Sequence, residues 1–429
     1  MTIRRFASPW IAAAFAAMPV AALAQLVLPP VGTQVVPQGP AQATQDQDVL
    51  TFDVGGGAER HSNIFLLPAG VDPTPLFGRP SRSDTVLRGL VGVNFERIFS
   101  LQRIRLDARV EPTKFVEHSR FDYVGYNAGG TWDWQVGRPL FGQVGIRLRR
   151  MLAPFDAALT TQRNMEDRRN LRAAAGFRFT PSWAVLAGVE HESLDNSVAV
   201  RRGLDYQFLT AEAGVRYAPG TGTEIDFVYR RTDGDYPNRQ VFDALGNLLP
   251  AAIDNQFKQD AFLARLQIRP NEDSRIQGTA GYVQRKFDNL PQRDFSGPTA
   301  GIDVDWAPTG ALVIRTSLVR DIYTEELITA NYVDVRTLAV RPLWRVTGRI
   351  SLLGNAVFSQ RTYKGDPGFV LTGAQVRKDD FTALGVQVHY EFTRTILATA
   401  ELRRDRRSSN YPGFDFTDNV AAVGLRARF

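Results

Sequence analysis

The chain contains no cysteine and only five lysines among its 429 residues. The lack of cysteine excludes a disulfide scaffold, a thiolate metal site and a thiol nucleophile. Long apolar runs are also scarce, since the one stretch that approaches membrane length is residues 10–24, which Pro19 interrupts. A membrane-spanning helix needs about 20 consecutive apolar residues. The sequence therefore argues against a helical membrane protein.

The basic side of the composition is almost entirely arginine. The chain has 51 basic and 45 acidic residues, and all of the basic residues except the five lysines are arginine. Such an excess of arginine is typical of proteins that meet polyanions, of which nucleic acid is the first to consider.

The N-terminus has the features of an export signal. Arg4 and Arg5 form a positive end, residues 11–20 are apolar, and residues 22–24 form a small-residue cleavage site. We expect a signal peptide over residues 1–24 and a flexible, Pro- and Gln-rich periplasmic leader over residues 25–48. Because the mature chain is exported, nucleic acid is not an expected partner.

Apolar and polar residues alternate with a period of two from about residue 50 to the end of the chain. In residues 102–112 the even positions include Leu106, Ala108 and Val110, whereas the odd positions are ionic. Alternation of this kind predicts strands with one apolar and one ionic face. A soluble β-sandwich alternates in the same way, so the turns are needed to distinguish the two.

Short connections recur between the alternating segments at long and fairly regular intervals. We place eight of them, six with proline, at residues 97–100, 137–139, 180–182, 219–222, 269–273, 308–310, 341–343 and 393–394. Longer polar connections lie between them, most clearly at residues 60–84, 154–168, 232–256, 287–298 and 361–380. This alternation is typical of bacterial outer-membrane barrels. It predicts an all-β fold over residues 49–429, a closed antiparallel transmembrane barrel of about eighteen strands, with sixteen as the alternative.

Aromatic residues mark one end of the predicted barrel. The tryptophans of the mature chain lie near short turns with the parity of the apolar face, and we assign them to an aromatic girdle: Trp132, Trp134, Trp183, Trp306 and Trp344. The last strand ends on Phe429, which resembles the assembly signal of outer-membrane barrels. We therefore expect the bacterial outer membrane as the location. Its lipid, lipopolysaccharide and the barrel assembly machinery are the expected partners.

The ionic face of each strand is predicted to line the lumen. A one-residue slip of segment 102–112 would turn its arginines toward lipid, at a cost on the order of 10 kcal/mol. The same argument assigns ten arginines to the pore wall: Arg103, Arg105, Arg109, Arg147, Arg149, Arg172, Arg216, Arg265, Arg269 and Arg403. Two interpretations stay open. The wall is either cross-linked by salt bridges that stiffen the barrel, or a basic conduit for an anionic polymer.

Catalysis finds little support in the sequence. His61 and His118 fall at loop edges, His191 shares the parity of the apolar face, and His389 points inward two residues before Glu391. That last pair could orient a nucleophile, although a contact within the wall is the simpler interpretation. The sequence shows no metal-ligand spacing, Gly-rich phosphate loop or nucleophile elbow. We therefore expect no catalytic residue, no metal and no cofactor.

Several short segments of the N-terminal half resemble a known family. They are residues 62–69 (SNIFLLPA), 82–85 (RSDT), 100–103 (SLQR) and 121–127 (FDYVGYN). They are similar to the EpsL-type outer-membrane barrels, a porin-like group associated with exopolysaccharide biosynthesis and export. The chain departs from that pattern at residues 61–62 (HS), where the family tends to carry an acid before the asparagine. The resemblance implies export of a polysaccharide, with periplasmic export components as partners.

Two classes of function therefore remain open from the sequence. The first is a component of exopolysaccharide export, and the second is a general or substrate-selective diffusion porin, with an outer-membrane hydrolase as a remote third. A porin usually carries an acidic constriction loop inside the lumen. Segment 232–256 is the candidate here, because it holds four aspartates against Arg239.

Overall fold

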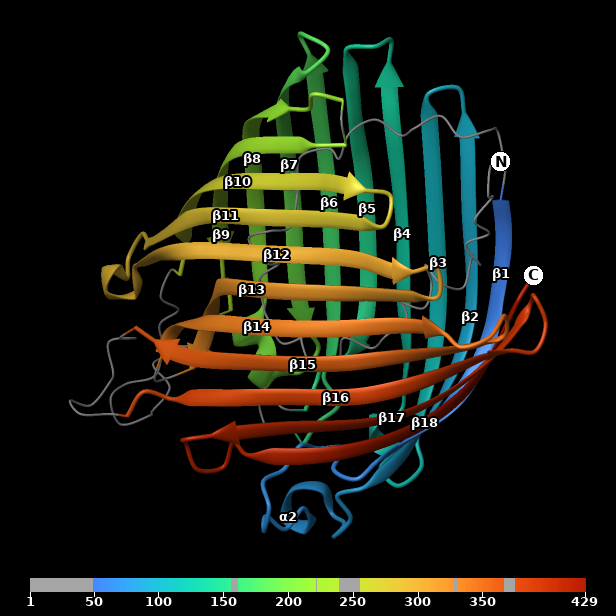
Figure 1. Cartoon of the computed structure of the whole chain (residues 1–429). Helices are drawn as coiled ribbons and strands as arrows, with labels where there is room; N and C mark the ends of the chain where they lie inside the picture. The colour runs from blue at the N-terminus through green and yellow to red at the C-terminus, as the bar shows by residue number, and fades with distance from the viewer. Residues whose placement is uncertain (1–48, 156–160, 221, 239–254, 328–329, 366–374) are drawn as a thin grey trace.

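The chain forms one closed antiparallel barrel of eighteen strands in the computed structural model (Figure 1). The structure describes residues 49–155, 161–220, 222–238, 255–327, 330–365 and 375–429. Each strand pairs with its neighbours in sequence, and β18 pairs with β1 to close the ring. The predicted fold class and the count of eighteen are confirmed. The signal peptide and the leader lie outside the described residues.

The first half of the barrel contains β1 (Val49–His61), β2 (Asp84–Phe99), β3 (Gln102–Phe115), β4 (Tyr123–Val136), β5 (Leu140–Leu152), β6 (Met165–Arg178), β7 (Trp183–Asn196), β8 (Tyr206–Tyr217) and β9 (Glu224–Asp235). The second half contains β10 (Phe257–Asn271), β11 (Ser274–Phe287), β12 (Phe295–Thr309), β13 (Leu312–Leu327), β14 (Ala330–Arg345), β15 (Ile350–Lys364), β16 (Lys378–Glu391), β17 (Ile396–Ser409) and β18 (Phe416–Arg428). The connections hold the short helices α2 (Thr74–Phe77), η1 (Ser119–Phe121), η2 (Ala199–Leu204) and η3 (Pro291–Arg293). Within the described residues, no helix is long and apolar enough to cross a membrane.

The two ends of the barrel differ, as Figure 1 shows. The short turns that follow the even-numbered strands lie at one end, together with the start of β1 and the end of β18. The longer connections, with α2 and the 3-10 helices, lie at the other end. We refer to these as the turn end and the loop end. In an outer-membrane barrel they correspond to the periplasm and the cell surface.

Some predicted boundaries were wrong by several residues. The turn predicted at residues 341–343 lies inside β14, and the chain reverses at residues 346–349 instead. Pro342 is tolerated there because β14–β15 pairing skips its position and its ring packs over Gly354, which has no Cβ to collide with it. At the loop end β9, β6 and β12 extend into the segments predicted as loops, since their polar residues there hide the alternation.

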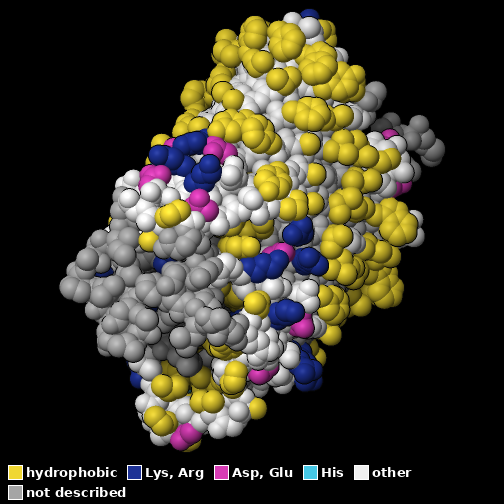
Figure 2. Space-filling view, turned by 90° about the vertical axis from the view of Figure 1, so that its left-hand side faces the viewer, with side chains coloured by type: hydrophobic (Ala, Val, Ile, Leu, Met, Phe, Trp, Pro, Cys, Tyr) yellow, Lys and Arg dark blue, Asp and Glu magenta, His cyan; other side chains and the backbone are white. Residues whose placement is uncertain are grey.

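The outward face of the barrel is apolar. Exposed large hydrophobic side chains alternate along the strands, for example Leu106 and Val110 of β3, and Figure 2 shows the belt that they form. The tryptophans assigned to the girdle all lie at the turn ends of β4, β7, β12 and β14. Their position at the lipid headgroups stays a prediction. Phe429 is also exposed, and its backbone pairs with Phe52 of β1.

Candidate functional site: the lumen and its outer mouth

The first connection of the loop end, residues 62–83, is fastened to the barrel by Asn63. The Asn63 side-chain amide donates to the Leu67 carbonyl at 2.8 Å, and its oxygen accepts the Leu67 N–H at 3.0 Å. The Asn63 backbone N–H donates to the Asp418 carboxylate of β18 at 2.8 Å. These bonds close segment 63–67 into a compact turn, which we call the bridge.

The bridge contacts two separate parts of the barrel wall. Phe65 belongs to a buried cluster with Val86 of β2 and Phe115 of β3. Leu66 takes the left-handed conformation, with φ 53°, and packs against a second cluster. That cluster contains inward residues of β14, β15, β16 and β18: Ala339, Val357, Phe381, Ala383 and Phe416. The bridge therefore crosses the mouth beside β17, β18 and β1.

Aromatic rings hold the rest of the first loop in place. The ring of Phe65 stacks on that of Phe77 of α2 at 3.7 Å and lies 5.7 Å from that of Phe121 of η1. His118 contributes to the same core, because its Nδ1 lies 2.9 Å from the buried Asp84 carboxylate. Each aromatic pair contributes about 0.5–1.5 kcal/mol beyond its buried area. The loop is thus a packed structure at the mouth.

The remaining histidines make contacts that do not assemble a catalytic group. His61 Nδ1 and the Ser62 hydroxyl both contact the same carboxylate, Asp418, at 2.6 and 3.2 Å, so the acid lies between them. A nucleophile needs the histidine in the middle. His389 Nε2 lies 2.9 Å from the Gln387 side chain, and His191 is exposed on the outward face, as its parity predicts. Within the described residues, no acid or histidine group is arranged to hold a metal.

Nine of the ten predicted pore-wall arginines lie on the inward face of their strands, opposite the exposed apolar side chains. Seven of these have a carboxylate within 4.0 Å: Arg103, Arg105, Arg109, Arg147, Arg216, Arg265 and Arg403. Across the described ranges Arg149 and Arg172 have no such pair. Arg269 lies at the turn-end rim, where the register of β10 shifts.

The arginines divide into two environments, and the first is on β3, β5 and β6. We call seven of their inward arginines the basic wall: Arg103, Arg105, Arg109, Arg147, Arg149, Arg168 and Arg172. Their side chains meet water, since that of Arg105 is 43% exposed and that of Arg147 is 47% exposed. The register places Arg109, Arg149 and Arg168 in one row across the strands. A second row contains Arg105 and Arg172.

Two glycines let arginines of the basic wall lie flat against it. Arg147 crosses Gly129 to reach the Asp107 carboxylate at 2.7 Å, and a Cβ on Gly129 would lie 2.7 Å from the Arg147 Cζ atom. Arg172 lies over Gly145 in the same way, 3.2 Å from the position of its missing Cβ. These guanidinium groups therefore lie across the neighbouring strands, flat against the wall, and leave the lumen beside them open.

The second environment is a buried cluster on β8, β9 and β10. Glu212 accepts from Arg230 Nε at 2.6 Å and from Arg265 at 2.7 and 3.2 Å, and its side chain is 0% exposed. Arg216 forms a bidentate pair with Asp226, with both bonds at 2.7 Å. Hydrogen bonds saturate these carboxylates and join three strands. This buried cluster matches the cross-linked wall, which was one of the two interpretations of the sequence.

Comparison with known proteins agrees with this architecture. The family model described as "Putative beta-barrel porin 2" matches residues 276–429. The chain is a porin-like outer-membrane β-barrel. No curated protein is significantly similar to it in sequence.

The solved structures that the chain matches are distant in sequence. The outer-membrane protein OpdK of Pseudomonas aeruginosa is 12% identical, with 89% of this chain and 99% of that chain covered and a TM-score of 0.45. OccK2 (OpdF) of Pseudomonas aeruginosa, in complex with glucuronate, is 8% identical over 89% and 98% of the two chains, with a TM-score of 0.46. A bacterial polysaccharide outer membrane secretin is 12% identical over 89% and 98%, with a TM-score of 0.34.

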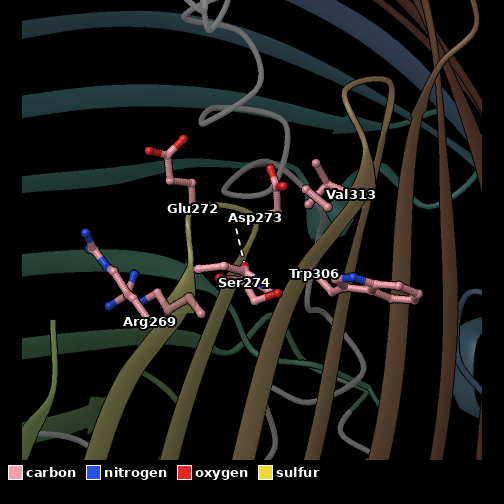
Figure 3. Close-up of a pocket in the computed structure, with 10 residues that line it drawn as sticks. Arg269, Glu272, Asp273, Ser274, Trp306 and Val313 are labelled. Carbon is pink, nitrogen blue, oxygen red and sulfur yellow. Dashed lines mark hydrogen bonds between the residues drawn. The ribbon is translucent and has the colours of Figure 1, made fainter. Parts of the chain in front are cut away.

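A cavity of about 680 Å³ lies at the turn end of the barrel, between β10 and β13. Arg269, Glu272 and Asp273 line it, and Figure 3 shows Trp306 extending away from Arg269. Arg275 and Asp305 also line the cavity, so its lining contains both positive and negative side chains. The cavity is an open, ionic rim of the periplasmic mouth rather than an enclosed ligand site.

Sequence reasoning missed three residues of this barrel. Asp53 of β1 binds Arg426 and Arg428 of β18 at 2.8 Å each, which ties together the strands that close the ring. Arg230 is the third cation of the buried cluster. The sequence could have placed it on the inward face, because it has the same parity as Asp226 on the same strand. Asn63 lies in segment 62–69, which the family resemblance singled out, but the segment has no periodicity that predicts a structural role for this residue. The predicted constriction loop falls largely on residues 239–254, outside the described residues.

Proposed function

We propose that this outer-membrane barrel conducts an anionic polysaccharide through its lumen to the cell surface. The observation that carries the proposal is the basic wall, whose water-exposed rows of arginine include Arg149 and Arg172 without a carboxylate partner in the described chain. The resemblance of residues 62–127 to exopolysaccharide-export barrels supports the same function. Together they favour an exported polymer with acidic sugars or acidic substituents.

The geometry of the basic wall suits transient contact with such a polymer. Its arginines form successive rows on three strands, so a chain of acidic sugars meets one row after another. Each contact is weak because the lumen contains water and salt, with a screening length of about 8 Å at physiological ionic strength. Conduction requires many weak sites rather than one strong site.

The outer mouth adds a restriction on size. The bridge spans the mouth from the cluster that contains Phe115 of β3 to the cluster of β14, β15, β16 and β18, and the basic wall lies deeper in the lumen on β3, β5 and β6. A solute that leaves through the mouth must therefore pass beside the bridge. An extended polymer chain, narrow in cross-section, meets this condition.

A diffusion channel for small anions is the second candidate. The mixture of arginines and carboxylates on the basic wall, such as Arg147 with Asp107 and Arg105 with Asp133, is the observation that favours it. Such pairs form a transverse field that orients small polar solutes in a water-filled pore. The two candidates predict different phenotypes for a strain without the protein.

The experiment measures exopolysaccharide at the surface and in the periplasm of a deletion strain. We expect polymer to disappear from the surface and to return with the wild-type gene. A triple variant, Arg147→Gln, Arg149→Gln and Arg172→Gln, should restore only part of the surface polymer. Arg150→Gln with Arg169→Gln is the matched control, since both residues lie on the outward face of β5 and β6.

Each outcome of this experiment separates the candidates. Undiminished surface polymer in the deletion strain, together with slower uptake of small acidic sugars, would favour the diffusion channel. Full restoration of export by the triple variant would leave the conduit in place and remove the role of the basic wall.

A further inference from the structure

The outer, membrane-facing surface carries a groove that spans β16, β17, β18 and β1. Its volume is about 830 Å³. The floor is apolar and consists of Leu384, Val386, Leu402 and Ala421, whereas Arg60 and Arg404 stand at its edge. We propose that this groove binds a phosphorylated, acylated lipid of the outer leaflet, of the lipopolysaccharide type. Acyl chains would lie on the floor, with the phosphate between the two arginines.

The register of the strands explains why the surface is hollow at this place. Ala421 pairs with Leu402 on one side and with Arg60 on the other, so a methyl group lies between two long side chains. Val386 continues the same row on β16. Because the floor residues belong to three hydrogen-bonded strands, β16, β17 and β18, the groove is rigid and exists before any ligand binds.

The charges at the groove lack an acidic partner. Arg404 and its neighbour Arg406 are exposed on the outward face, and neither has an ion pair in the part of the chain that the structure describes. Arg60 is held by neutral hydroxyl groups, because it donates to Ser83 at 2.7 Å and to Thr85 at 3.1 Å. These bonds fix the guanidinium group without neutralising its charge.

Other outward arginines near the loop end differ in this respect. Arg150 lies 3.5 Å from Asp167 and Arg169 lies 3.9 Å from Asp195. Arg320 is 3.2 Å from Asp334. Figure 2 shows such mixed clusters of both charges between the hydrophobic belt and the loops. The positive charge at the groove is therefore not compensated by an acidic side chain, and it is available to bind an anion that is not part of the protein.

The position and the chemistry of the groove select the occupant. Arg60 and Arg404 lie toward the loop end of β1 and β17, which is the outer-leaflet side of an outer-membrane barrel. A phosphate accepts bidentate hydrogen bonds from arginine, and an acyl chain suits an apolar floor. A second copy of the chain would bring two further arginines to the same place, so like charges oppose that arrangement.

The test uses the purified full-length barrel in detergent and bisphosphorylated lipid A as the probe. Binding is measured by native mass spectrometry for the wild type and for Arg60→Gln with Arg404→Gln. We expect the double variant to bind roughly tenfold more weakly, because it loses charge-assisted hydrogen bonds to phosphate. Lys258→Gln with Lys286→Gln is the control, since both lysines are exposed and outward on β10 and β11, far from the groove.

Two further measurements make the proposal falsifiable. Lipid A without its phosphates should bind the wild type about as weakly as the intact probe binds the double variant. Ala421→Phe fills the floor and should also weaken binding, while heat-modifiable migration confirms that each variant is folded. Equal weakening by the control, equal binding of the dephosphorylated probe, or no effect of Ala421→Phe would each overturn the proposal.

Discussion

The basic wall of β3, β5 and β6 and the buried cluster of β8, β9 and β10 contain the same residue types at the same parity. Their exposure separates them, because the Arg147 side chain is 47% exposed whereas that of Arg265 is 3% exposed. In the basic wall a guanidinium group stays in contact with water. In the buried cluster it has exchanged water for Glu212, which two arginines share.

This difference assigns a different role to each set. Ion pairs in contact with water contribute about 0–1 kcal/mol to stability, so those of the basic wall are available for solutes. Removing one partner of a buried pair costs about 3–5 kcal/mol, since it leaves an uncompensated charge. The sequence presented the cross-linked wall and the basic conduit as alternatives, but one lumen holds both the buried cluster and the water-exposed arginines on which the proposed conduit rests.

The largest expected effect is on the buried cluster. Glu212→Gln should lower the free energy of unfolding by about 3–5 kcal/mol, because it leaves Arg230 and Arg265 buried beside a neutral group. Asp107→Asn, the matched change on the basic wall, should lower it by less than about 1 kcal/mol. Urea unfolding in detergent, followed by loss of heat-modifiable migration, measures both. Equal losses would show that the two environments do not differ.

The second effect concerns the bridge, which crosses the mouth of the lumen that contains both sets. Asn63→Ala removes both side-chain bonds to Leu67, at about 1–3 kcal/mol for the buried groups that lose their partners. We expect a larger single-channel conductance and faster proteolysis within residues 66–80. Thr74→Ala, at the exposed start of α2, is the control and should change neither. An unchanged conductance in the Asn63 variant would mean that the bridge does not restrict the mouth.

The smallest expected effect is a change of shape in the basic wall. Gly129→Ala places a methyl group where the guanidinium of Arg147 lies, so this flexible side chain must turn into the lumen and leave Asp107. Stability should change by less than about 1 kcal/mol, since only an exposed pair is lost. Conductance should fall, because the displaced side chain narrows the path. A conductance equal to that of the wild type would contradict the flat arrangement.

The sequence predicted the fold well because a barrel wall is periodic. Alternation gives the two faces of every strand, and short turns give the strand number. Pro342 shows where this reasoning fails. A proline normally ends strand pairing, but Pro342 lies inside β14 with its ring over Gly354 of β15. Strand boundaries at the loop end were also missed, because both faces become polar where a strand leaves the membrane.

The division of the lumen could not be predicted from the sequence. Parity shows that Arg147 and Arg265 both point inward, but burial depends on which side chains of neighbouring strands stand beside each one. Asp226, Arg230 and Glu212 enclose one set, whereas Gly129 and Gly145 leave room around the other. The bridge could not be predicted from the sequence for a different reason. Its bonds from Asn63 reach Leu67 and β18, a contact that links residues 355 positions apart.

The ion selectivity of the open channel tests the basic wall most directly. The reversal potential of the purified protein in a planar bilayer, under a gradient of KCl, reports whether anions or cations pass more readily. We predict a wild-type channel that favours chloride, and a clear shift toward cations in the Arg147→Gln, Arg149→Gln and Arg172→Gln triple variant. Arg150→Gln with Arg169→Gln, on the outward face, should leave the potential unchanged. An identical reversal potential in the wild type and the triple variant would contradict the assignment of the basic wall as the conducting surface.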